Sequence, residues 1–293
     1  MNPYTALRRT WAVPRVINTM SSFTISSSKS RGYQYFSLCR AYSSFNMSPS
    51  PEIIDTAAAI ADLVDLCKDV PNDPPSLYVD IEGINLSRYG SISIMQIYHV
   101  PRNQIYLVDV HTLGQTAFST PSPTGTTLKS ILESPTIQKA FFDVRNDSDA
   151  LYSHFGVHLG GIHDIQLLEL ATRSFPRRFV TGLSRCIEYN AELSTADSIQ
   201  WKAIKDRGRK LFAPELGGSY SVFNTRPMAE ELAQYCAQDV CILPQLWRLY
   251  HDKLEPAWAE KMQAAVRERI DVCLDSAYTG KGRDMALVPK GWA

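Results

Sequence analysis

Residues 77–86 read LYVDIEGINL and place two acidic side chains at the end of what is otherwise an apolar β-strand. Residues 77–79 are apolar and favour strands, and they lead directly to Asp80 and Glu82. Positions i and i+2 of a strand point to the same face, so both carboxylates lie on one side of the sheet. Two neighbouring carboxylates repel each other and resist desolvation unless a cation neutralises them. The stretch predicts either a bound metal or a strand end whose acids are solvated.

The residue types at this strand indicate which metal would bind. Carboxylate oxygens, without nitrogen or sulfur ligands, favour Mg²⁺ or Mn²⁺ over zinc. The six cysteines are scattered and form no CxxC pair, so they are predicted to be small apolar residues in a reducing compartment. Gly83 follows the two acids and is expected to let a substrate backbone approach closely.

A second pair of candidate ligands lies in the segment YCAQDV, residues 235–240. Tyr235 and Asp239 are four residues apart in a strongly helical stretch, so the phenol and the carboxylate share one helix face. Pro227 suits the first turn of this predicted helix, which runs over residues 227–252. A phenol and a carboxylate stacked in this way can hold a metal ion and a water molecule together. A simple pair on the helix surface is the alternative interpretation.

A third group of acids occurs in KAFFDVRNDSDALYSHFG, residues 139–156, where a predicted strand runs into a predicted helix. Asp147 lies four residues before Leu151 and therefore on the apolar stripe of the helix, which packs inward. Asp149 falls off that stripe and is predicted to be solvated. Asp143 belongs to the end of the strand. We expect Asp147 to face a site, with Asp143 as the alternative.

Elsewhere the chain shows strand patterns first and mostly helical patterns afterwards, which favours an α/β domain with a mixed sheet. Segments 91–100 and 104–110, separated by the turn 101–103, are predicted to be antiparallel neighbours. Pro- and Ser-rich segments at 47–52 and 69–76 are predicted linkers. The predicted strands are 77–82, 91–100, 104–110 and 137–144, and the predicted helices are 53–67, 127–133, 147–155, 164–173, 182–189, 199–211, 227–252 and 254–276.

Length, composition and charge exclude several classes of protein. A chain of 293 residues, 44% of them hydrophobic, is long enough for one large domain with a buried core and extensions. No apolar run approaches the roughly 18 residues of a membrane span, so no membrane association is predicted. The formal net charge is +0, but all 30 acidic residues lie after residue 50, against 24 of the 30 basic residues. This mildly acidic remainder argues against a generic basic nucleic-acid binder.

The first 46 residues have a composition of their own. They are rich in Arg and Ser, lack acidic residues and contain amphipathic patches such as TALRRTWAVPRVI, as mitochondrial transit peptides do. The stretch CRAYSS, residues 39–44, resembles a matrix-protease site. We therefore predict that residues 1–46 direct the protein to mitochondria. The alternative is a tail bypassed by translation from Met20 or Met47, which would leave the protein in the cytoplasm or nucleus.

The three acidic motifs, taken in this order, resemble those of the DEDDy 3′–5′ exonuclease superfamily. The chain is most similar to the branch that contains ribonuclease D, the Werner-type exonuclease domains and the fungal 3′–5′ exonuclease-domain proteins. The resemblance spans roughly residues 55–250. Four segments carry it: DIEGINLSRYGSISIMQI for the first motif, RNDSDAL for the second, DIQLLELATR for the helix that follows, and RPMAEELAQYCAQDVCILPQL for the third.

This resemblance implies a ribonuclease-H-like α/β fold, with a mixed five-stranded sheet flanked by helices. The acids are expected to converge at one end of the sheet. With the targeting segment predicted from composition over 1–46, the expected organisation is completed by an exonuclease domain over 51–252 and a helical C-terminal extension over 253–293. The last segment is too short for the further helical domains that ribonuclease D carries, so the resemblance does not imply tRNA trimming.

The resemblance also implies a metal-dependent 3′–5′ exonuclease that hydrolyses phosphodiester bonds at nucleic-acid 3′ ends by a two-metal-ion mechanism. The cofactors would be two divalent cations, Mg²⁺ or Mn²⁺. By this resemblance Asp80, Glu82 and Asp239 hold one ion, and Asp80 bridges to the second, which Asp147 helps to position. Tyr235 would orient the attacking water by a hydrogen bond, because a phenol with a pKa of about 10 is a poor base at neutral pH.

Candidate substrate contacts come from two places. Leu86 and Arg88 follow the first motif, in the region that contacts the terminal nucleotide in related enzymes. The segment WKAIKDRGRKLF carries Lys202, Lys205 and Arg207, which could grip the phosphate backbone of single-stranded or 3′-ended DNA or RNA. A solvated helix face with salt bridges is the alternative for this basic segment.

Two other functions compete with the enzyme. A catalytically silent nucleic-acid-binding or scaffold module would share the fold, but loss of activity normally removes one or more of the four acids, and all four are present with the tyrosine. A nucleotide-binding α/β protein would need a Gly-rich phosphate loop, which the sequence lacks. Shortening of a labelled oligonucleotide from its 3′ end separates the enzyme from the silent module.

Overall fold

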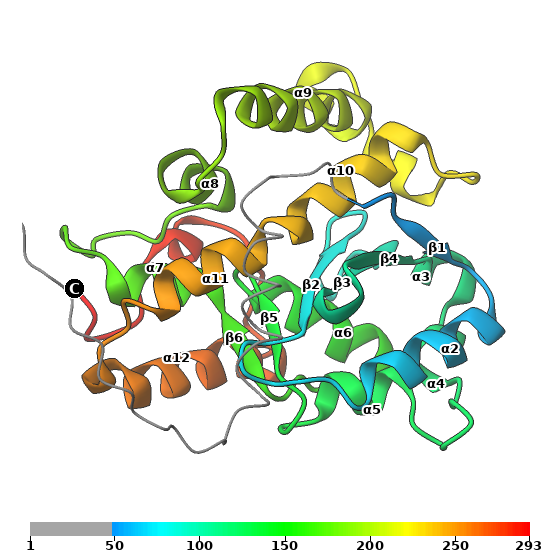
Figure 1. Cartoon of the computed structure of the whole chain (residues 1–293), viewed down its shortest axis with the longest axis horizontal. Coiled ribbons are helices and arrows are strands. Elements are labelled where there is room, and N and C mark those ends of the chain that lie inside the picture. The colour runs from blue at the N-terminus through cyan, green and yellow to red at the C-terminus, as the bar shows by residue number, and fades with distance from the viewer. Residues whose placement is uncertain (1–48) are drawn as a thin grey trace, which may run out of the picture. The chain divides into compact units, whose positions relative to one another are not determined.

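The computed structural model describes residues 49–293 and shows a mixed β-sheet with helices on both faces (Figure 1). Within these residues the sheet has six strands in the order β1-β4-β3-β2-β5-β6. The pairs β2–β3 and β3–β4 are antiparallel, whereas β1–β4, β2–β5 and β5–β6 are parallel. The strands are β1 (Glu52–Ile54), β2 (Leu77–Glu82), β3 (Ile94–His99), β4 (Gln104–Val108), β5 (Lys139–Phe141) and β6 (Ile162–Asp164). The predicted segment 1–46 lies outside the described residues.

The sheet has six strands, whereas the resemblance implied five and the sequence patterns placed four; the two edge strands, β1 and β6, were not predicted. Residues 47–52 were predicted to be a linker and 53–67 a helix, but β1 forms over Glu52–Ile54 and the helix begins only at Ala57. The side chain of Thr56 accepts a hydrogen bond from the Ala59 backbone and so caps this helix. A strand of three residues is too short to show a periodic pattern, and for the same reason β6 was not predicted.

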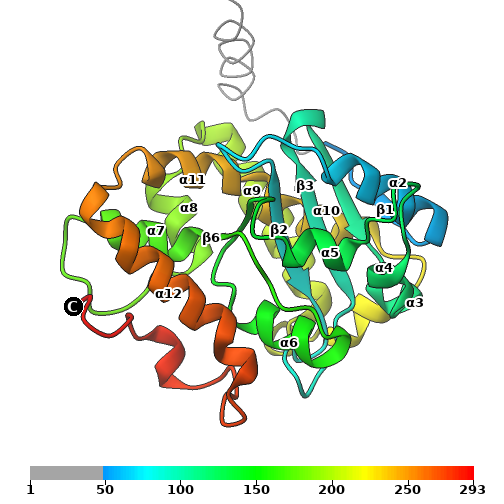
Figure 2. The same cartoon turned by 90° about the horizontal axis from the view of Figure 1, so that it is seen from below.

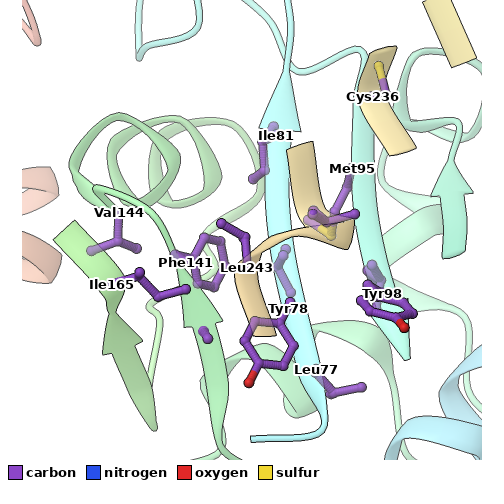
Figure 3. Packing of buried hydrophobic residues seen from close by; sticks show 14 of the residues in the cluster. Leu77, Tyr78, Ile81, Met95, Tyr98, Phe141, Val144, Ile165, Cys236 and Leu243 are labelled. Carbon is purple, nitrogen blue, oxygen red and sulfur yellow. The ribbon is translucent and has the colours of Figure 1, made fainter. Parts of the chain in front are cut away.

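Strand β2 lies between β3 and β5, in the middle of the sheet (Figure 3). Leu77, Tyr78, Val79 and Ile81 are at most 3% exposed, so both faces of this strand are covered. Figure 3 shows Leu77, Tyr78 and Ile81 within the apolar cluster that fills the space between sheet and helices. A central strand with both faces covered is a rigid support, and it carries the two acids to the end of the sheet.

Helices cover both faces of the sheet. Helix α10 packs on β2, β3 and β4, while α2 and α5 pack on each other on the opposite face (Figure 2). Helix α9 lies against α10, on the side away from the sheet. The α-helices after β1 are α2 (Ala57–Cys67), α3 (Val110–Leu113), α4 (Thr116–Ser119), α5 (Leu128–Glu133), α6 (Arg145–Phe155), α7 (Ile165–Thr172), α8 (Leu183–Asn190), α9 (Thr195–Phe212), α10 (Glu230–Cys241), α11 (Leu243–His251) and α12 (Ala259–Asp271).

The helix predicted over 227–252 is two helices. Helix α10 ends at Cys241 and α11 begins at Leu243, with Pro244 in its first turn. A proline lacks the backbone N–H that a continuous helix would require, so the helix is interrupted here. Helix α10 also begins later than predicted, at Glu230, so Pro227 precedes the helix rather than occupying its first turn. The position of Tyr235 and Asp239 inside α10 is unaffected.

The C-terminal extension, residues 253–293, packs against the rest of the domain. Helix α12 contacts α6 and α7, and Trp292, one residue before the end of the sequence, is only 5% exposed. The described residues, 49–293, accordingly belong to one compact unit. None of the helices among the described residues is long and apolar enough to cross a membrane.

Candidate active site

Three of the predicted ligands come together at the end of β2. Each of Asp80, Glu82 and Asp239 offers a carboxylate oxygen, and these oxygens all lie within 4.8 Å of one another. Strand β2 supplies the first two from successive positions on one face, and α10, which crosses that face, supplies the third. The Asp239 side chain is buried, while Asp80 and Glu82 are partly exposed. Solvent therefore reaches the two carboxylates of β2, whereas the carboxylate of α10 is shielded from it.

Asp147 approaches the same cluster from the first turn of α6. It is 5% exposed, and burial raises its pKa well above the usual range, with the negative charge of Asp80 as the next cause and Glu82 also contributing. Asp143, the alternative, is turned to other partners: Arg145 binds both of its carboxylate oxygens at 2.6 Å. Asp147 is thus the acid of this segment that is influenced by the charge of the cluster and has no ion-paired partner among the described residues.

The acids shift one another's protonation. Burial raises the pKa of Asp80 to about 7, and the charge of Asp239 adds to the shift. Burial and the charge of Asp80 raise the pKa of Glu82 well above its usual range. Lys205 acts in the opposite direction on both carboxyls. Full ionisation of the cluster at neutral pH therefore requires more positive charge than this lysine provides.

Lys205 occupies a position that the sequence did not predict in detail. Its ammonium binds both carboxylate oxygens of Asp239, with the longer contact at 2.7 Å, and lies 4.1 Å from the centre of the Tyr235 ring. Gly208, one turn further along α9, allows this approach, since a Cβ there would lie 2.6 Å from the Tyr235 side chain. A lysine predicted to bind phosphate thus contacts a predicted metal ligand.

Tyr235 is 7% exposed, and its ring packs edge-on against Phe212 at 5.0 Å between centroids. Burial, followed by the charge of Asp239, raises the pKa of its hydroxyl far above the usual range. The phenol therefore keeps its proton throughout the physiological pH range. It can donate a hydrogen bond, but it cannot act as a general base.

Two other predictions about acids and glycines were wrong. Asp149, predicted to be solvated, is fully buried, and its carboxylate accepts hydrogen bonds from the backbone and the guanidinium of Arg88, each at 2.8 Å. The partner is 61 residues away in sequence, so the helical pattern of α6 could not indicate it. Gly83 makes room for this chain's own backbone, because a Cβ there would lie 2.0 Å from the Ser91 carbonyl oxygen.

The other predicted substrate contacts do not gather at the cluster. The guanidinium of Arg88 is engaged by Asp149 and by two backbone carbonyls. Leu86 is partly buried against the hydrophobic core. Lys202 is exposed, and Arg207 lines a separate cavity of about 750 Å³ between α9, α10 and the segment before β1. Of these five residues, Lys205 is the one that contacts a member of the cluster.

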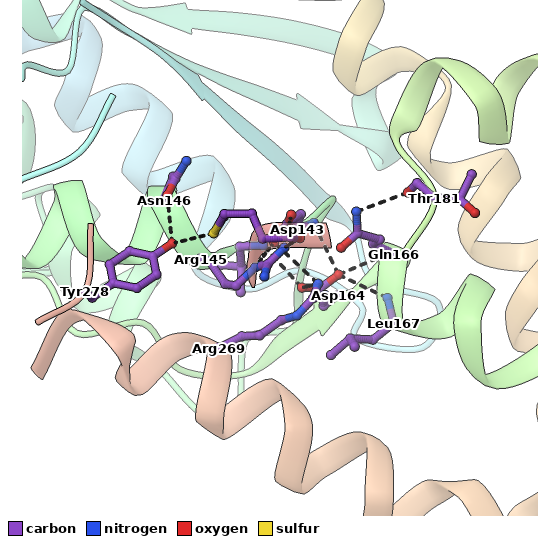
Figure 4. Close-up of polar contacts among 11 residues, drawn as sticks. Asp143, Arg145, Asn146, Asp164, Gln166, Leu167, Thr181, Arg269 and Tyr278 are labelled. Carbon is purple, nitrogen blue, oxygen red and sulfur yellow. Dashed lines mark hydrogen bonds and ion pairs between the residues drawn. The ribbon is translucent and has the colours of Figure 1, made fainter. Parts of the chain in front are cut away.

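A group of buried charges at the turn into α6 was not predicted from the sequence (Figure 4). Asp164 is fully buried, and its carboxylate accepts hydrogen bonds from the backbone N–H groups of Asp143 and Val144 at 3.2 Å. Arg269 of α12 donates to the same carboxylate at 2.7 Å. The partners are 105 residues apart, and no local pattern links them. The one signal in the sequence was the position of Asp164 just before α7, where an aspartate is expected to cap the helix.

Comparisons with known proteins show which sequences and structures this chain is similar to. A family model described as 3′-5′ exonuclease matches residues 51–255. The mouse (Mus musculus) piRNA biogenesis protein EXD1 is 28% identical over 174 residues, which cover 57% of this chain and 27% of the relative. Human (Homo sapiens) EXD1 is 32% identical over 94 residues, covering 32% of this chain and 17% of the relative. The matched part of the chain therefore spans 27% of the length of the mouse relative and 17% of the human one.

Solved structures show the same fold. The structure of Trypanosoma brucei RNase D complexed with RNA U12 superposes with a TM-score of 0.65 at 20% identity, covering 84% of this chain and 79% of that one. The catalytic core of RRP6 from the same organism gives 0.53 at 20% identity, covering 80% and 54%. At this identity the likeness concerns the fold alone, which is ribonuclease-H-like. With the family match over most of the chain, this protein belongs to the 3′–5′ exonuclease domain family.

Proposed function

We propose that this protein is a divalent-metal-dependent 3′–5′ exonuclease of the DEDDy type, which hydrolyses phosphodiester bonds at the 3′ ends of nucleic acids. The observation that carries the proposal is the convergence of Asp80, Glu82 and Asp239 within 4.8 Å, beside a buried Asp147 that feels the charge of Asp80. Such a concentration of carboxylates at the end of a central strand costs folding free energy, so it indicates a site for cations.

The donor set fits Mg²⁺ or Mn²⁺. All four candidate ligands are carboxylates, which are hard oxygen donors, and no histidine or cysteine belongs to the cluster among the described residues. Asp80, Glu82 and Asp239 would hold one ion, and Asp80 with Asp147 would hold a second. The charge of Asp80 raises the pKa of both Glu82 and Asp147, which supports its place between the two sets.

When bound, the two ions would supply the positive charge that stabilises a phosphodiester transition state and that lowers the pKa of an attacking water. The protein's own groups do the rest. The Tyr235 hydroxyl, which stays protonated, donates a hydrogen bond that orients the water or a phosphate oxygen. Lys205 binds Asp239 when no metal is present, and once a metal ion takes its place there the lysine would supply positive charge to the phosphate of the last nucleotide.

The proposed substrate is a single strand of nucleic acid with a free 3′ end. The structure of the Trypanosoma brucei RNase D neighbour contains RNA U12, and the curated relatives are described as piRNA biogenesis proteins, which supports RNA as the first substrate to test. DNA remains the matched comparison, because a metal-held phosphate is common to both polymers and distinguishes neither.

A 5′-labelled RNA and a DNA of the same sequence, incubated with Mg²⁺ or Mn²⁺, test the proposal. We expect a ladder that shortens from the 3′ end, loses intensity with a chelator and is absent with the variant Asp80→Asn. An oligonucleotide blocked by a 3′ phosphate controls for endonucleases. Binding without shortening of either strand would overturn the proposal and favour the silent module.

We further propose that residues 1–46 direct the protein to mitochondria, supported by six basic and no acidic residues in the first 50. Fusing residues 1–46 to a fluorescent reporter tests this. Mitochondrial signal that disappears when Arg8, Arg9 and Arg15 are replaced by Glu is the expected result. A diffuse cytoplasmic or nuclear signal from the unaltered fusion would contradict it.

A further inference from the structure

The residues on either side of Asp147 in the first turns of α6 are bonded to the C-terminal extension. Each bond joins a different residue of α6 to a different point of the extension, which passes α6 as α12 and then as the irregular segment 272–292. The bonds are Arg145 Nη2 to the Met285 carbonyl at 2.8 Å, the Tyr278 hydroxyl to Asn146 Oδ1 at 2.7 Å, and Ser148 Oγ to the Ile270 carbonyl at 2.6 Å.

Asp149 is joined to the same extension through one intermediate. Arg88 donates to the Asp149 carboxylate, and its Nη2 donates to the carbonyls of Val272 and Cys273 at 3.3 and 3.4 Å. Asp147 is the exception within residues 145–149: its carboxylate accepts no hydrogen bond from the residues that the structure describes, and after burial the negative charge of Asp80 is the next cause that raises its pKa. The extension thus holds α6 through the neighbours of Asp147 and leaves the Asp147 carboxylate without a hydrogen-bond donor, so it remains free to bind a cation.

Arg269 of α12 reaches the point where α6 begins (Figure 4). Its Nη1 lies 2.7 Å from Asp164 Oδ2 and 3.5 Å from Asp143 Oδ1. Asp164 in turn accepts the backbone N–H groups of Asp143 and Val144, and Asp143 has a left-handed backbone with φ of 63°. This conformation is uncommon for residues other than glycine, although aspartate reaches it more readily than most, and here Asp164 holds the backbone N–H groups at the turn. The turn into α6 therefore depends on the Asp164–Arg269 pair.

The pair is deeply buried, with Arg269 5% and Asp164 0% exposed. Removal of the guanidinium would leave the Asp164 carboxylate without its charge partner in a medium of low dielectric. The carboxylate could then no longer hold the two backbone N–H groups in the same way. A shift of the Asp143–Val144 turn would carry Asp147, which lies three residues later, away from Asp80.

We propose that the C-terminal extension completes the active site, with Arg269 as a positioning residue that fixes Asp147 at the second metal position through Asp164 and the turn into α6. This inference rests on the proposed function, since it assigns Asp147 to a metal. It goes beyond that function because the family match ends at residue 255, before α12 begins. Arg269 touches neither metal nor substrate and acts only through its partners.

The test is Mn²⁺ binding to the full-length protein, measured by calorimetry and electron paramagnetic resonance in the presence of a nucleoside 5′-monophosphate. We expect two binding events in the unaltered protein. The variant Arg269→Met should weaken the weaker event about 10–100-fold and leave the tighter one, as expected when a group behind a metal ligand is removed. Asp147→Asn should show the same pattern. Arg269→Lys, which keeps the charge, should restore part of the affinity.

The matched control is Arg267→Met, on the same helix but exposed, which should bind Mn²⁺ as the unaltered protein does. Circular dichroism establishes that each variant is folded. If Arg269→Met does not fold, Ser148→Ala decides, because it removes one hydroxyl that holds α6 to Ile270, and it should weaken the same event several-fold. A folded Arg269→Met, or Ser148→Ala in its place, with both events unchanged overturns this inference alone. An unaltered protein that binds no Mn²⁺ overturns the proposed function itself.

Discussion

Asp239 and Asp147 approach the same cluster from two helices, α10 and α6, and the protein supports these two acids in different ways. Asp239 has a cation of its own, because Lys205 of α9 binds its carboxylate directly. Asp147 has no ion pair among the described residues, and its position depends on bonds made by its neighbours in α6 to the C-terminal extension. Asp239 is thus paired with a cation, whereas Asp147 is held in place without a cation partner among the described residues.

This difference teaches how the two halves of the site should respond to change. An acid with a lysine partner tolerates the absence of metal, and a metal ion can take the place of the lysine. An acid held only through its backbone gains from metal but does not depend on it for its position. Variants at Lys205 should therefore alter stability without metal, whereas variants behind α6 should alter metal binding.

The largest effect is expected for Asp80→Asn, which removes the carboxylate that both halves share. Turnover should fall by about 10³-fold, the scale of losing one preorganised charge in a site of this kind. Without metal the variant should be at least as stable as the unaltered protein, because burial and Asp239 already disfavour the charge on Asp80. Single-turnover cleavage of 5′-labelled RNA and thermal melts in a chelator measure the two quantities.

The control is Asp206→Asn, an exposed acid on α9, which should change neither turnover nor stability. Cleavage by Asp80→Asn at the unaltered rate would contradict the proposal that the ion held with Asp239 and the ion held with Asp147 share the Asp80 carboxylate.

The sequence predicted the half of the site that local geometry determines. The strand 77–82 has the predicted bounds, and the spacing of two residues in a strand and of four in a helix put Asp80, Glu82 and Asp239 on the faces that now meet. A mixed sheet was predicted and is confirmed, because alternating and continuous apolar patterns over five or six residues report strands well.

The other half depends on contacts between residues far apart in the chain. The bond between Arg269 and Asp164 spans 105 residues, and that between Arg88 and Asp149 spans 61. No periodicity indicates such partners, so Asp149 was predicted to be solvated although it is fully buried. The edge strand β1 was not predicted for a different reason, since three residues are too few to show a periodic hydrophobic pattern. Local spacing thus locates ligands, and tertiary contacts decide what holds them.

Lys205→Met tests whether Asp239 depends on its lysine. Removing one partner of a buried ion pair should lower the free energy of unfolding by about 3–5 kcal/mol when no metal is present. Millimolar Mg²⁺ should restore more stability to this variant than to the unaltered protein, because the ion binds only the folded cluster and no longer competes with the lysine. Denaturant unfolding with and without Mg²⁺ measures both values.

Lys210→Met, an exposed lysine of the same helix, is the control and should leave stability within about 0.5 kcal/mol. Equal gains from Mg²⁺ in Lys205→Met and in the unaltered protein would contradict the idea that lysine and metal share Asp239.

Gly208→Ala asks how closely α9 must approach α10. The added methyl would lie 2.6 Å from Cβ and Cδ2 of Tyr235. Cβ is bonded to the backbone, so a change of side-chain rotamer cannot move it away from the methyl. The clash should cost about 1–3 kcal/mol, more than the helix propensity that alanine gains. Combined with Lys205→Met the loss should be less than additive, because both changes weaken the same contact. Gly182→Ala, where a methyl meets nothing within 4 Å, is the control, and full additivity would show that the helix spacing and the ion pair are independent.

The smallest effect is expected on the pH dependence of stability, through a histidine on β6 next to Asp164. His163, next to Asp164 on β6, accepts a hydrogen bond from the Trp247 indole at Nδ1 and lies 3.1 Å from the Gln138 side-chain oxygen at Nε2, an arrangement that fits the neutral ring. Burial and the nearby His251 lower its pKa from 6.5 to about 4, while Asp73 opposes the shift. The unfolded chain therefore binds a proton between these values that the folded one does not, and stability falls as the pH drops.

His163→Asn keeps an acceptor near the indole but cannot titrate. The unaltered protein should lose roughly 1 kcal/mol more than this variant between pH 7 and 5.5, measured by denaturant unfolding in a chelator so that metal does not contribute. Lys205→Met should change the pH dependence in a different way, because this lysine opposes the raised pKa values of Asp80 and Glu82 at the α9–α10 side. If His163→Asn loses stability with acid as steeply as the unaltered protein, some other group sets the acid sensitivity. The α6 side would then have no titrating support at β6, and the two halves of the site would differ in metal binding alone.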